Sequence, residues 1–318
     1  MFRFDANEKT AKMLRKTILV IAGFILFFSG KSLAQDNSLG SISDEGRAFL
    51  RAMEDSLIVT ADSMYTAYIP DTRPAYCERF VKQLIKALKV PNSYKYPFDT
   101  LSKKINIIYP DDNSYRIFNW NIQPTPVTNR YYGAIQMPAE QLKLYPMIDY
   151  SDDIGKNATD SPLSKTKWYG AIYYRIITHE VDGKKIYTLF GLNAASPISN
   201  KKVLEPLEFT DNGPVFGAQI FNINSETAPG NRIYRFIIEY KKEVQASMNW
   251  DDELKVIYFD KLQSQVNDPN RKYTYVPSGQ YDGFKWQDDQ WKYVSDLIPV
   301  QSLKDGEAPS GEKPFNAK

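Results

Sequence analysis

The sequence has few of the residues that usually build catalytic or cross-linked sites: it contains one cysteine, Cys77, and one histidine, His179. A single cysteine excludes an internal disulfide, so the burial of apolar side chains must stabilise the fold. A single histidine excludes a histidine-rich metal site. We interpret Cys77 as a small buried side chain within a helix. We interpret His179, which lies just before a predicted turn, as a solvent-exposed residue.

Recognisable catalytic motifs are also missing. The chain has no Gly-x-Ser-x-Gly nucleophile turn, no His-Glu-x-x-His or Cys-x-x-Cys motif and no glycine-rich phosphate loop. It has no cluster of basic residues either, and its 40 Lys and Arg nearly balance its 38 Asp and Glu. These absences argue against the commonest exported enzyme classes, and they predict no nucleic-acid partner.

A secretory signal peptide is predicted over residues 1–34. Basic residues precede an apolar run at 18–28, and small residues then fit a cleavage site between Ala34 and Gln35. A membrane-spanning helix needs about 20 apolar residues, so this run is too short for an anchor. We therefore expect a periplasmic or extracellular protein without a membrane span in the mature chain. Acidic residues near the beginning favour Met13 as the true start of the leader.

Two amphipathic helices are predicted after the leader. In residues 43–68, apolar side chains recur every three or four positions behind Ser43, a residue type that caps helices. A second stripe runs through residues 74–88 and begins at Pro74, which suits a first helical turn. The short connection between them predicts a helical hairpin that covers another surface.

The rest of the chain has the residue pattern that is typical of a β protein. From residue 101 onward, short runs rich in Ile, Val, Tyr, Phe and Trp alternate with turn residues. Asp182-Gly183 and Asn212-Gly213 are typical of tight hairpins, and Asp251-Asp252 and Asp288-Asp289 indicate further turns. Both faces of residues 168–178 are apolar or aromatic. We therefore expect that strand to be central in its sheet and to be covered by the N-terminal helices.

These patterns predict an α+β fold in which the N-terminal amphipathic helix pair packs on a large antiparallel β meander. The meander is expected to form a sandwich, a barrel or a partial propeller. The predicted organisation is a helical region over residues 35–98, an antiparallel β domain over 99–298 and a disordered tail over 299–318.

Two candidate sites follow from residue types. A calcium site is the only cofactor site that the sequence suggests, because oxygen ligands crowd one polar loop; its candidate ligands are Asp149, Asp152, Asp153 and Asn157. Exposed aromatic rings can stack on sugars, which makes tryptophans candidate ligand-binding residues; those considered are Trp286, Trp291 and Trp168. Trp286 and Trp291 flank a predicted turn, so a cross-strand pair that serves packing is the competing interpretation.

Several segments of the β-rich part of the chain resemble segments of other exported proteins. They are residues 168–193 (WYGAIYYRIITHEVDGKKIYTLFGLN), 203–221, 245–260 and 281–284. Together, over about residues 165–295, the chain resembles a group of uncharacterised secreted proteins of Bacteroidota. The resemblance implies an exported β-rich protein and brings no catalytic residues with it.

The expected function is that of a non-enzymatic binding or envelope-associated module, with a carbohydrate or an envelope protein as partner. The alternative is a secreted hydrolase that acts on glycans or peptides. A cleft with two suitably spaced carboxylates would favour the hydrolase, whereas an aromatic surface without them would favour binding.

Overall fold

The computed structural model describes residues 40–125, 128–155, 158–223 and 232–297. The predicted signal peptide, its start at Met13 and the predicted tail lie outside these residues. Within the described ranges, no helix is both long enough and apolar enough to span a membrane.

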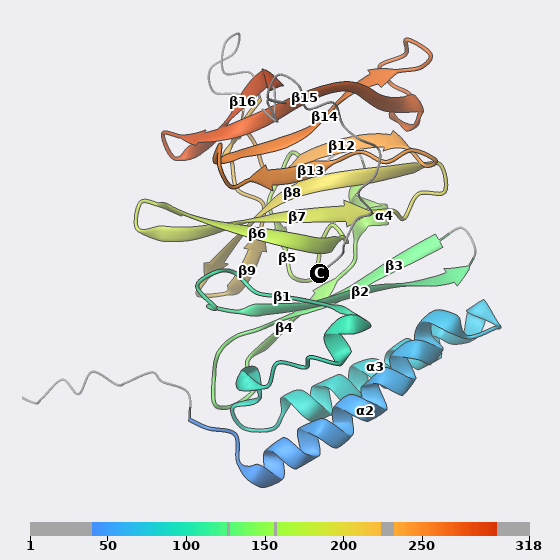
Figure 1. Ribbon diagram of the computed structural model, residues 1–318, viewed down its shortest axis with the longest axis vertical. Helices are drawn as coiled ribbons and strands as arrows, with labels where there is room; N and C mark the ends of the chain where they lie inside the picture. Colours follow the sequence, from blue (N-terminus) through green and yellow to red (C-terminus); the bar gives the residue numbers. More distant parts are fainter. Residues whose placement is uncertain (1–39, 126–127, 156–157, 224–231, 298–318) are drawn as a thin grey trace, which may run out of the picture. The chain divides into compact units, whose positions relative to one another are not determined.

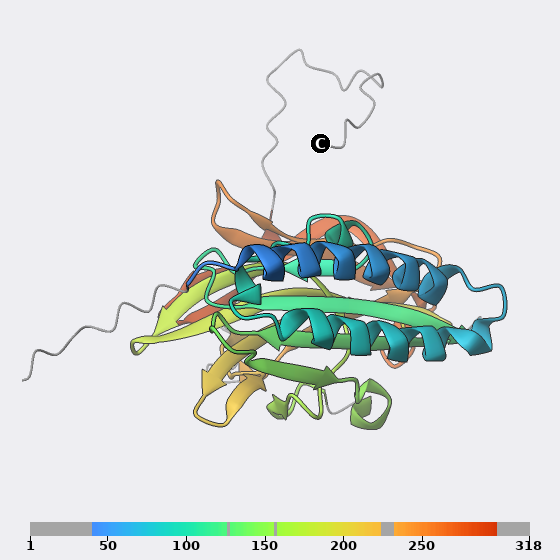
Figure 2. The ribbon, with the colours of Figure 1, turned by 90° about the horizontal axis from the view of Figure 1, so that it is seen from below.

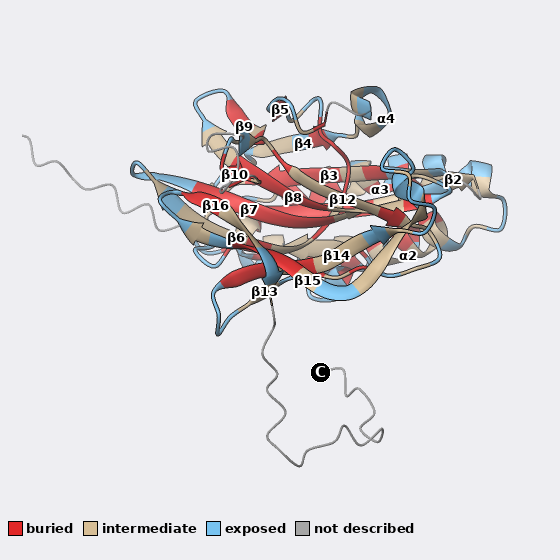
Figure 3. Ribbon diagram, turned by 90° about the horizontal axis from the view of Figure 1, so that it is seen from above, coloured by how far each residue is buried: buried red, intermediate tan, exposed pale blue. Residues whose placement is uncertain are grey.

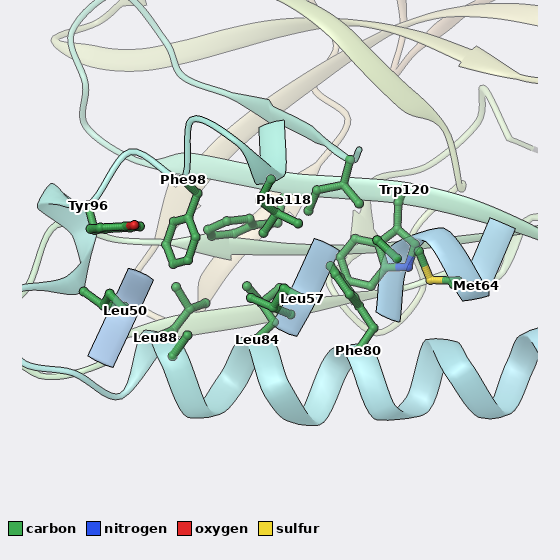
Figure 4. Close-up of a cluster of buried hydrophobic side chains, with 14 of the residues drawn as sticks. Leu50, Leu57, Met64, Phe80, Leu84, Leu88, Tyr96, Phe98, Phe118 and Trp120 are labelled. Atoms are coloured by element: carbon green, nitrogen blue, oxygen red, sulfur yellow. The ribbon is translucent and has the colours of Figure 1, made fainter. Parts of the chain in front are cut away.

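The predicted helix pair is confirmed as α2 (Asp44–Thr66) and α3 (Arg73–Leu88). Ser43 caps α2, since its Oγ accepts a hydrogen bond of 3.1 Å from the Gly46 amide. The apolar stripes of both helices, which include Leu57 and Phe80, are buried against each other and against the neighbouring sheet (Figure 4). Short helical turns follow at η2 (Pro70–Thr72), η3 (Ser93–Lys95), η4 (Leu101–Lys103), α4 (Ser151–Ile154) and η6 (Lys272–Thr274).

The strands form three sheets. The first sheet has the order β1-β2-β3-β4, with β1 (Asn106–Ile108), β2 (Arg116–Thr125), β3 (Thr128–Gln136) and β4 (Leu144–Ile148). The central sheet has the order β5-β9-β8-β7-β6, and β12 pairs with β8 beside β9. Its strands are β5 (Leu163–Ser164), β6 (Ile172–Val181), β7 (Lys184–Asn193), β8 (Ser199–Thr210), β9 (Gly213–Phe216) and β12 (Phe236–Lys241).

The outer sheet has the order β11-β10-β16-β15-β14-β13. Its strands are β10 (Phe221–Asn222), β11 (Arg232–Ile233), β13 (Met248–Asp251), β14 (Val256–Ser264), β15 (Tyr275–Gln287) and β16 (Gln290–Leu297). Nearly all strand pairs are antiparallel, and among the described strands only β10 and β16 pair in parallel.

Three hydrophobic cores stack these elements into layers (Figures 1 and 2). Neighbouring residues of β2 show why: Phe118 faces the helices, whereas Ile117 faces the central sheet. The other face of the central sheet, which includes Phe190, packs on the outer sheet. The strand interiors are therefore mostly buried and the connections exposed (Figure 3). The α+β prediction is confirmed, and the described strands form open stacked sheets rather than a closed barrel.

Two expectations about residues 168–178 are wrong. The strand there, β6, lies at the edge of the central sheet. It is covered by the first and outer sheets, whereas the helices cover the first sheet. Apolar residues on both faces of a strand indicate cover on both sides, but they do not identify the covering element.

Two of the predicted tight turns are confirmed at their residues, whereas the turn predicted at Asn212-Gly213 lies one residue earlier, at Asp211-Asn212, because Thr210 pairs with Gly213. Asp182 and Gly183 form a two-residue connection between β6 and β7, with φ angles of 51° and 73°. Asp288 and Asp289 connect β15 to β16 in the same way, at 52° and 57°.

Candidate functional site: a groove along an open strand edge

The strand β12 leaves one backbone edge of the central sheet open. Among the described strands β12 pairs only with β8, in a register that places Phe236 opposite Leu204 and Ile238 opposite Lys202. One pair further along, the Lys242 amide donates to the Ile198 carbonyl at 3.1 Å. Alternate residues of an antiparallel strand bond to the same neighbour. The peptide groups of Ile237 and Glu239 therefore point away from β8.

A cavity of about 740 Å³ runs along this open edge. It touches four consecutive residues of β12, from Phe236 to Glu239. A cavity against one face of a strand would touch every second residue, so contact with consecutive residues places this one along the edge. Its volume lies within the range of about 300–1,000 Å³ that is typical of ligand sites. We call it the β12 groove.

The two walls of the β12 groove differ in chemistry. The outer-sheet wall combines apolar and aromatic side chains, which include Phe259, Leu262 and Tyr293, with the charged side chains of Asp260, Lys261 and Asp282. The loop after α4 contributes small side chains at Ala158 and Thr159. Phe236 and Ile238 face the outer sheet, whereas Ile237 faces the opposite side. A molecule in the groove would therefore meet the aromatic cluster around Phe236 on one side and the face that carries Ile237 on the other.

Two carboxylates that line the groove, Asp260 and Asp282, form hydrogen bonds with neighbouring residues of the same wall. Asp260 accepts hydrogen bonds from the amide and the Oγ of Ser247, at 2.6 and 2.8 Å. Asp282 accepts from the Tyr293 hydroxyl and from the Asp296 amide. Burial, together with the bond to Asp282, raises the pKa of Tyr293, so this phenol remains a donor at neutral pH. These acids are occupied by structural hydrogen bonds.

The third carboxylate, Glu239, is the one nearest the open edge. It lies directly across from Lys201 of β8, on the same face of the sheet. Its Oε1 accepts a hydrogen bond of 2.5 Å from the Ser199 Oγ. Burial raises the pKa of Tyr169, which also lines the groove, and the charge of Glu239 raises it further. Glu239 is therefore half-buried, negatively charged and close to any bound molecule.

A buried ion pair fixes the loop wall. The Arg235 Nε donates to Glu205 Oε1 at 2.8 Å, and both side chains are fully buried. The same guanidinium donates to the carbonyls of Ala158 and Ser161 in the loop, and to the carbonyl of Phe216. The wall is therefore tied to the central sheet through one side chain.

A second cavity, of about 430 Å³, runs along the opposite edge of the central sheet beside Tyr174 to Thr178 of β6. This edge is partly closed by side chains. The Asn106 amide donates to the Tyr173 carbonyl, and Arg175 pairs with Asp252 at 3.0 Å across the strand. The β12 groove is larger, and the strand edge beside it is not closed by such side-chain contacts among the described residues, which makes it the stronger candidate site.

The tryptophans considered as ligand platforms do not line the β12 groove. Trp168 and Trp291 are fully buried, and their Nε1 groups donate to Tyr173 Oη at 2.7 Å and Thr188 Oγ1 at 3.0 Å. Trp286 is half-buried and lies directly across from Trp291, with ring centroids 5.0 Å apart. The predicted cross-strand pair is thus confirmed.

The interpretation of His179 as a surface residue is wrong. Its ring is half-buried and stacks on Trp286 with centroids 4.0 Å apart. Burial lowers the pKa of His179 to about 4, and its Nδ1 is buried without a hydrogen-bond partner among the described residues. The outer sheet covers this part of β6, which the local turn sequence does not reveal. Cys77 is buried in the helical core, as predicted.

The structure does not bring the candidate calcium ligands together as a metal site, because the described ones either bond to other residues of the protein or point into solvent. The Asp149 carboxylate accepts from the Tyr131 amide and from the amide and hydroxyl of Ser151. Asp152 pairs with Arg130 at 2.6 Å, Asp153 is exposed, and Asn157 lies outside the described residues. In the part of the chain that the structure describes, no three His, Cys, Asp or Glu side chains gather in a group that could hold a metal ion.

Comparison with known proteins gives no assignment: no family model, no curated protein and no solved structure matches this chain. The β12 groove is therefore the basis for a functional proposal.

Proposed function

We propose that this protein is an exported binding module that holds an extended segment of another polypeptide by adding it as a strand to β12. The main support for this proposal is that the peptide groups of Ile237 and Glu239 point away from β8 and into a groove. Open N–H and C=O groups at a strand edge recognise another backbone, and flanking pockets then select its side chains.

The shape of the site favours a single extended chain. Walls from the outer sheet and from the loop after α4 flank the edge, so a folded sheet is too thick to approach it. A single added strand needs a spacing of only about 4.8 Å from β12. The six residues of β12 could pair with a segment about 20 Å long.

The same residues give less support to a hydrolase. Glycan hydrolysis needs two carboxyl groups that are free to transfer protons or to attack the sugar. In the β12 groove, Asp260 and Asp282 accept hydrogen bonds from their own neighbours. We therefore prefer binding to catalysis at this site.

Substitution of Ile237 by proline provides the test. The Ile237 amide points away from β8, so Ile237→Pro removes a donor from the groove without removing a bond of the sheet. The matched control, Ile237→Ala, shortens the same side chain and keeps the amide. The probe is a fluorescein-labelled ten-residue peptide that alternates valine and threonine, and the readout is fluorescence anisotropy.

We expect saturable binding by the unmodified protein and by Ile237→Ala, and at least tenfold weaker binding by Ile237→Pro. Circular dichroism and urea unfolding verify that the proline variant is folded. If it is not, a probe peptide that is N-methylated at every residue replaces it. Neither edge of this peptide can donate a backbone hydrogen bond, so it should fail to bind the unmodified protein. Absence of saturable binding to the unmodified protein, or undiminished binding after the backbone donor is removed, would refute the proposal.

A further inference from the structure

The face of β12 that carries Glu239 restricts which segment can bind, provided that the proposed strand addition is correct. Side chains of an added strand alternate between the two faces of the sheet, as those of β12 do. On one face, Phe236 packs on Phe259 and Phe284, with centroids 4.8 and 4.9 Å apart. Every second residue of a bound segment would therefore meet this aromatic surface, which favours apolar side chains.

The intervening residues would meet the opposite face. There Lys201 of β8 lies across from Glu239 of β12, and a residue of the added strand would continue the same row. A basic side chain at that position would complete an alternating row of positive, negative and positive charges. An acidic side chain would face Glu239 directly, and like charges placed opposite each other are destabilising.

Among the described residues, the other charged groups near Glu239 have partners of their own. Lys241, two positions along β12, donates to Gln265 Oε1 at 3.5 Å. Arg235 and Glu205 are paired in the core. On the outer-sheet wall, Lys261 pairs with Asp296 at 2.7 Å, and the Lys272 Nζ lies 4.5 Å from the centre of the Tyr275 ring. The apolar positions of the segment, rather than its basic ones, would point toward that wall.

We infer that the β12 groove selects polypeptide segments in which apolar residues alternate with lysine or arginine, with one basic side chain beside Glu239. Glu239 is suited to this role because Ser199 donates to its Oε1, and no other described residue forms a hydrogen bond or ion pair with its second carboxylate oxygen. Its half-buried position limits screening by solvent.

Three labelled ten-residue peptides test the inference. All alternate valine with a second residue, which is threonine, lysine or glutamate. Each is titrated against the unmodified protein, the variant Glu239→Lys and the control Glu253→Lys. The control makes the same charge change at an exposed turn residue between β13 and β14.

For the unmodified protein we expect the lysine peptide to bind about tenfold more tightly than the glutamate peptide, with the threonine peptide between them. Glu239→Lys should reverse this order, whereas Glu253→Lys should preserve it. The preference should shrink as sodium chloride rises to about 0.5 M.

The outcomes separate the two proposals. Equal binding of all three peptides, or the same order in Glu239→Lys as in the unmodified protein, overturns the charge preference and leaves strand addition standing. If none of the three peptides binds, strand addition itself is wrong.

Discussion

Arg235 and Glu205 form an ion pair of 2.8 Å whose two side chains are fully buried. The pair lies between the central sheet and the loop that forms one wall of the β12 groove. Breaking a buried pair leaves an uncompensated charge in the core, whereas replacing both partners removes the charge altogether. Stability and the shape of the groove are therefore coupled at this position.

We expect Arg235→Met to lower the free energy of unfolding by about 3–5 kcal/mol. The double variant Arg235→Met/Glu205→Leu should recover part of that loss because no lone charge remains. Urea denaturation measures the free energies of unfolding of the single and the double variant. The exposed pair of Arg130 and Asp152 provides the control, and Asp152→Asn should cost less than about 1 kcal/mol. A single variant as stable as the unmodified protein would show that the pair is not buried as described.

His179 should make stability depend on pH. Its pKa is lowered by burial from 6.5 to about 4, so between these values the unfolded chain binds a proton that the folded chain does not. Its contribution to stability is complete above pH 6.5 and is lost as pH falls toward 4.

His179→Phe keeps a ring against Trp286 and removes the titration. Urea midpoints measured from pH 8 to pH 4 should show a growing advantage of the variant below pH 6.5 and a constant difference above it. A constant difference over the whole range would contradict the burial of His179.

Cys77 should be unreactive in the folded protein. Its side chain is 1% exposed and its Sγ accepts a hydrogen bond of 3.4 Å from Trp120 Nε1. Burial raises the pKa of the thiol, which lowers the amount of reactive thiolate. We expect iodoacetamide to label the native protein at least about 100-fold more slowly than the urea-unfolded protein. Rapid labelling without denaturant would place the thiol at the surface.

The two tight hairpins should respond in opposite directions to substitution. Gly183 has a φ of 73°, and a Cβ added there would meet nothing within 4 Å, so Gly183→Ala should cost about 1 kcal/mol through backbone strain alone. Asp289 has a φ of 57°, so Asp289→Gly should gain about 0.5–1 kcal/mol. Urea unfolding of the two variants measures both changes in the free energy of unfolding. A Gly183→Ala variant that is more stable than the unmodified protein would contradict the assigned turn.

Local patterns predicted the helices and turns because their causes are local. The Ser43 cap and the Asp182-Gly183 turn depend on residues within a few positions of each other. The assignment of strands to layers depends on pairings over long distances, which alternation does not encode. The pattern of residues 232–240 predicts one strand, but the structure divides this segment between β11 of the outer sheet and β12 of the central sheet. The open edge of β12 could not be recognised from the sequence. The clue to the site was Glu239, which stands between the apolar and aromatic residues Ile238 and Tyr240, together with Lys201 of β8, which aligns with it.

The last strand that the structure describes lies inside the outer sheet. β16 separates β10 from β15, and Phe221 pairs in parallel with Trp291, seventy positions later in the sequence. During synthesis from the N-terminus, the helices, the first sheet and much of the central sheet can form early. β10 and β11 can pair only with each other until β16 joins them to the rest of the outer sheet. The aromatic wall of the groove is thus assembled last. The outer-sheet wall of the β12 groove therefore cannot form until the residues of β16 have been synthesised.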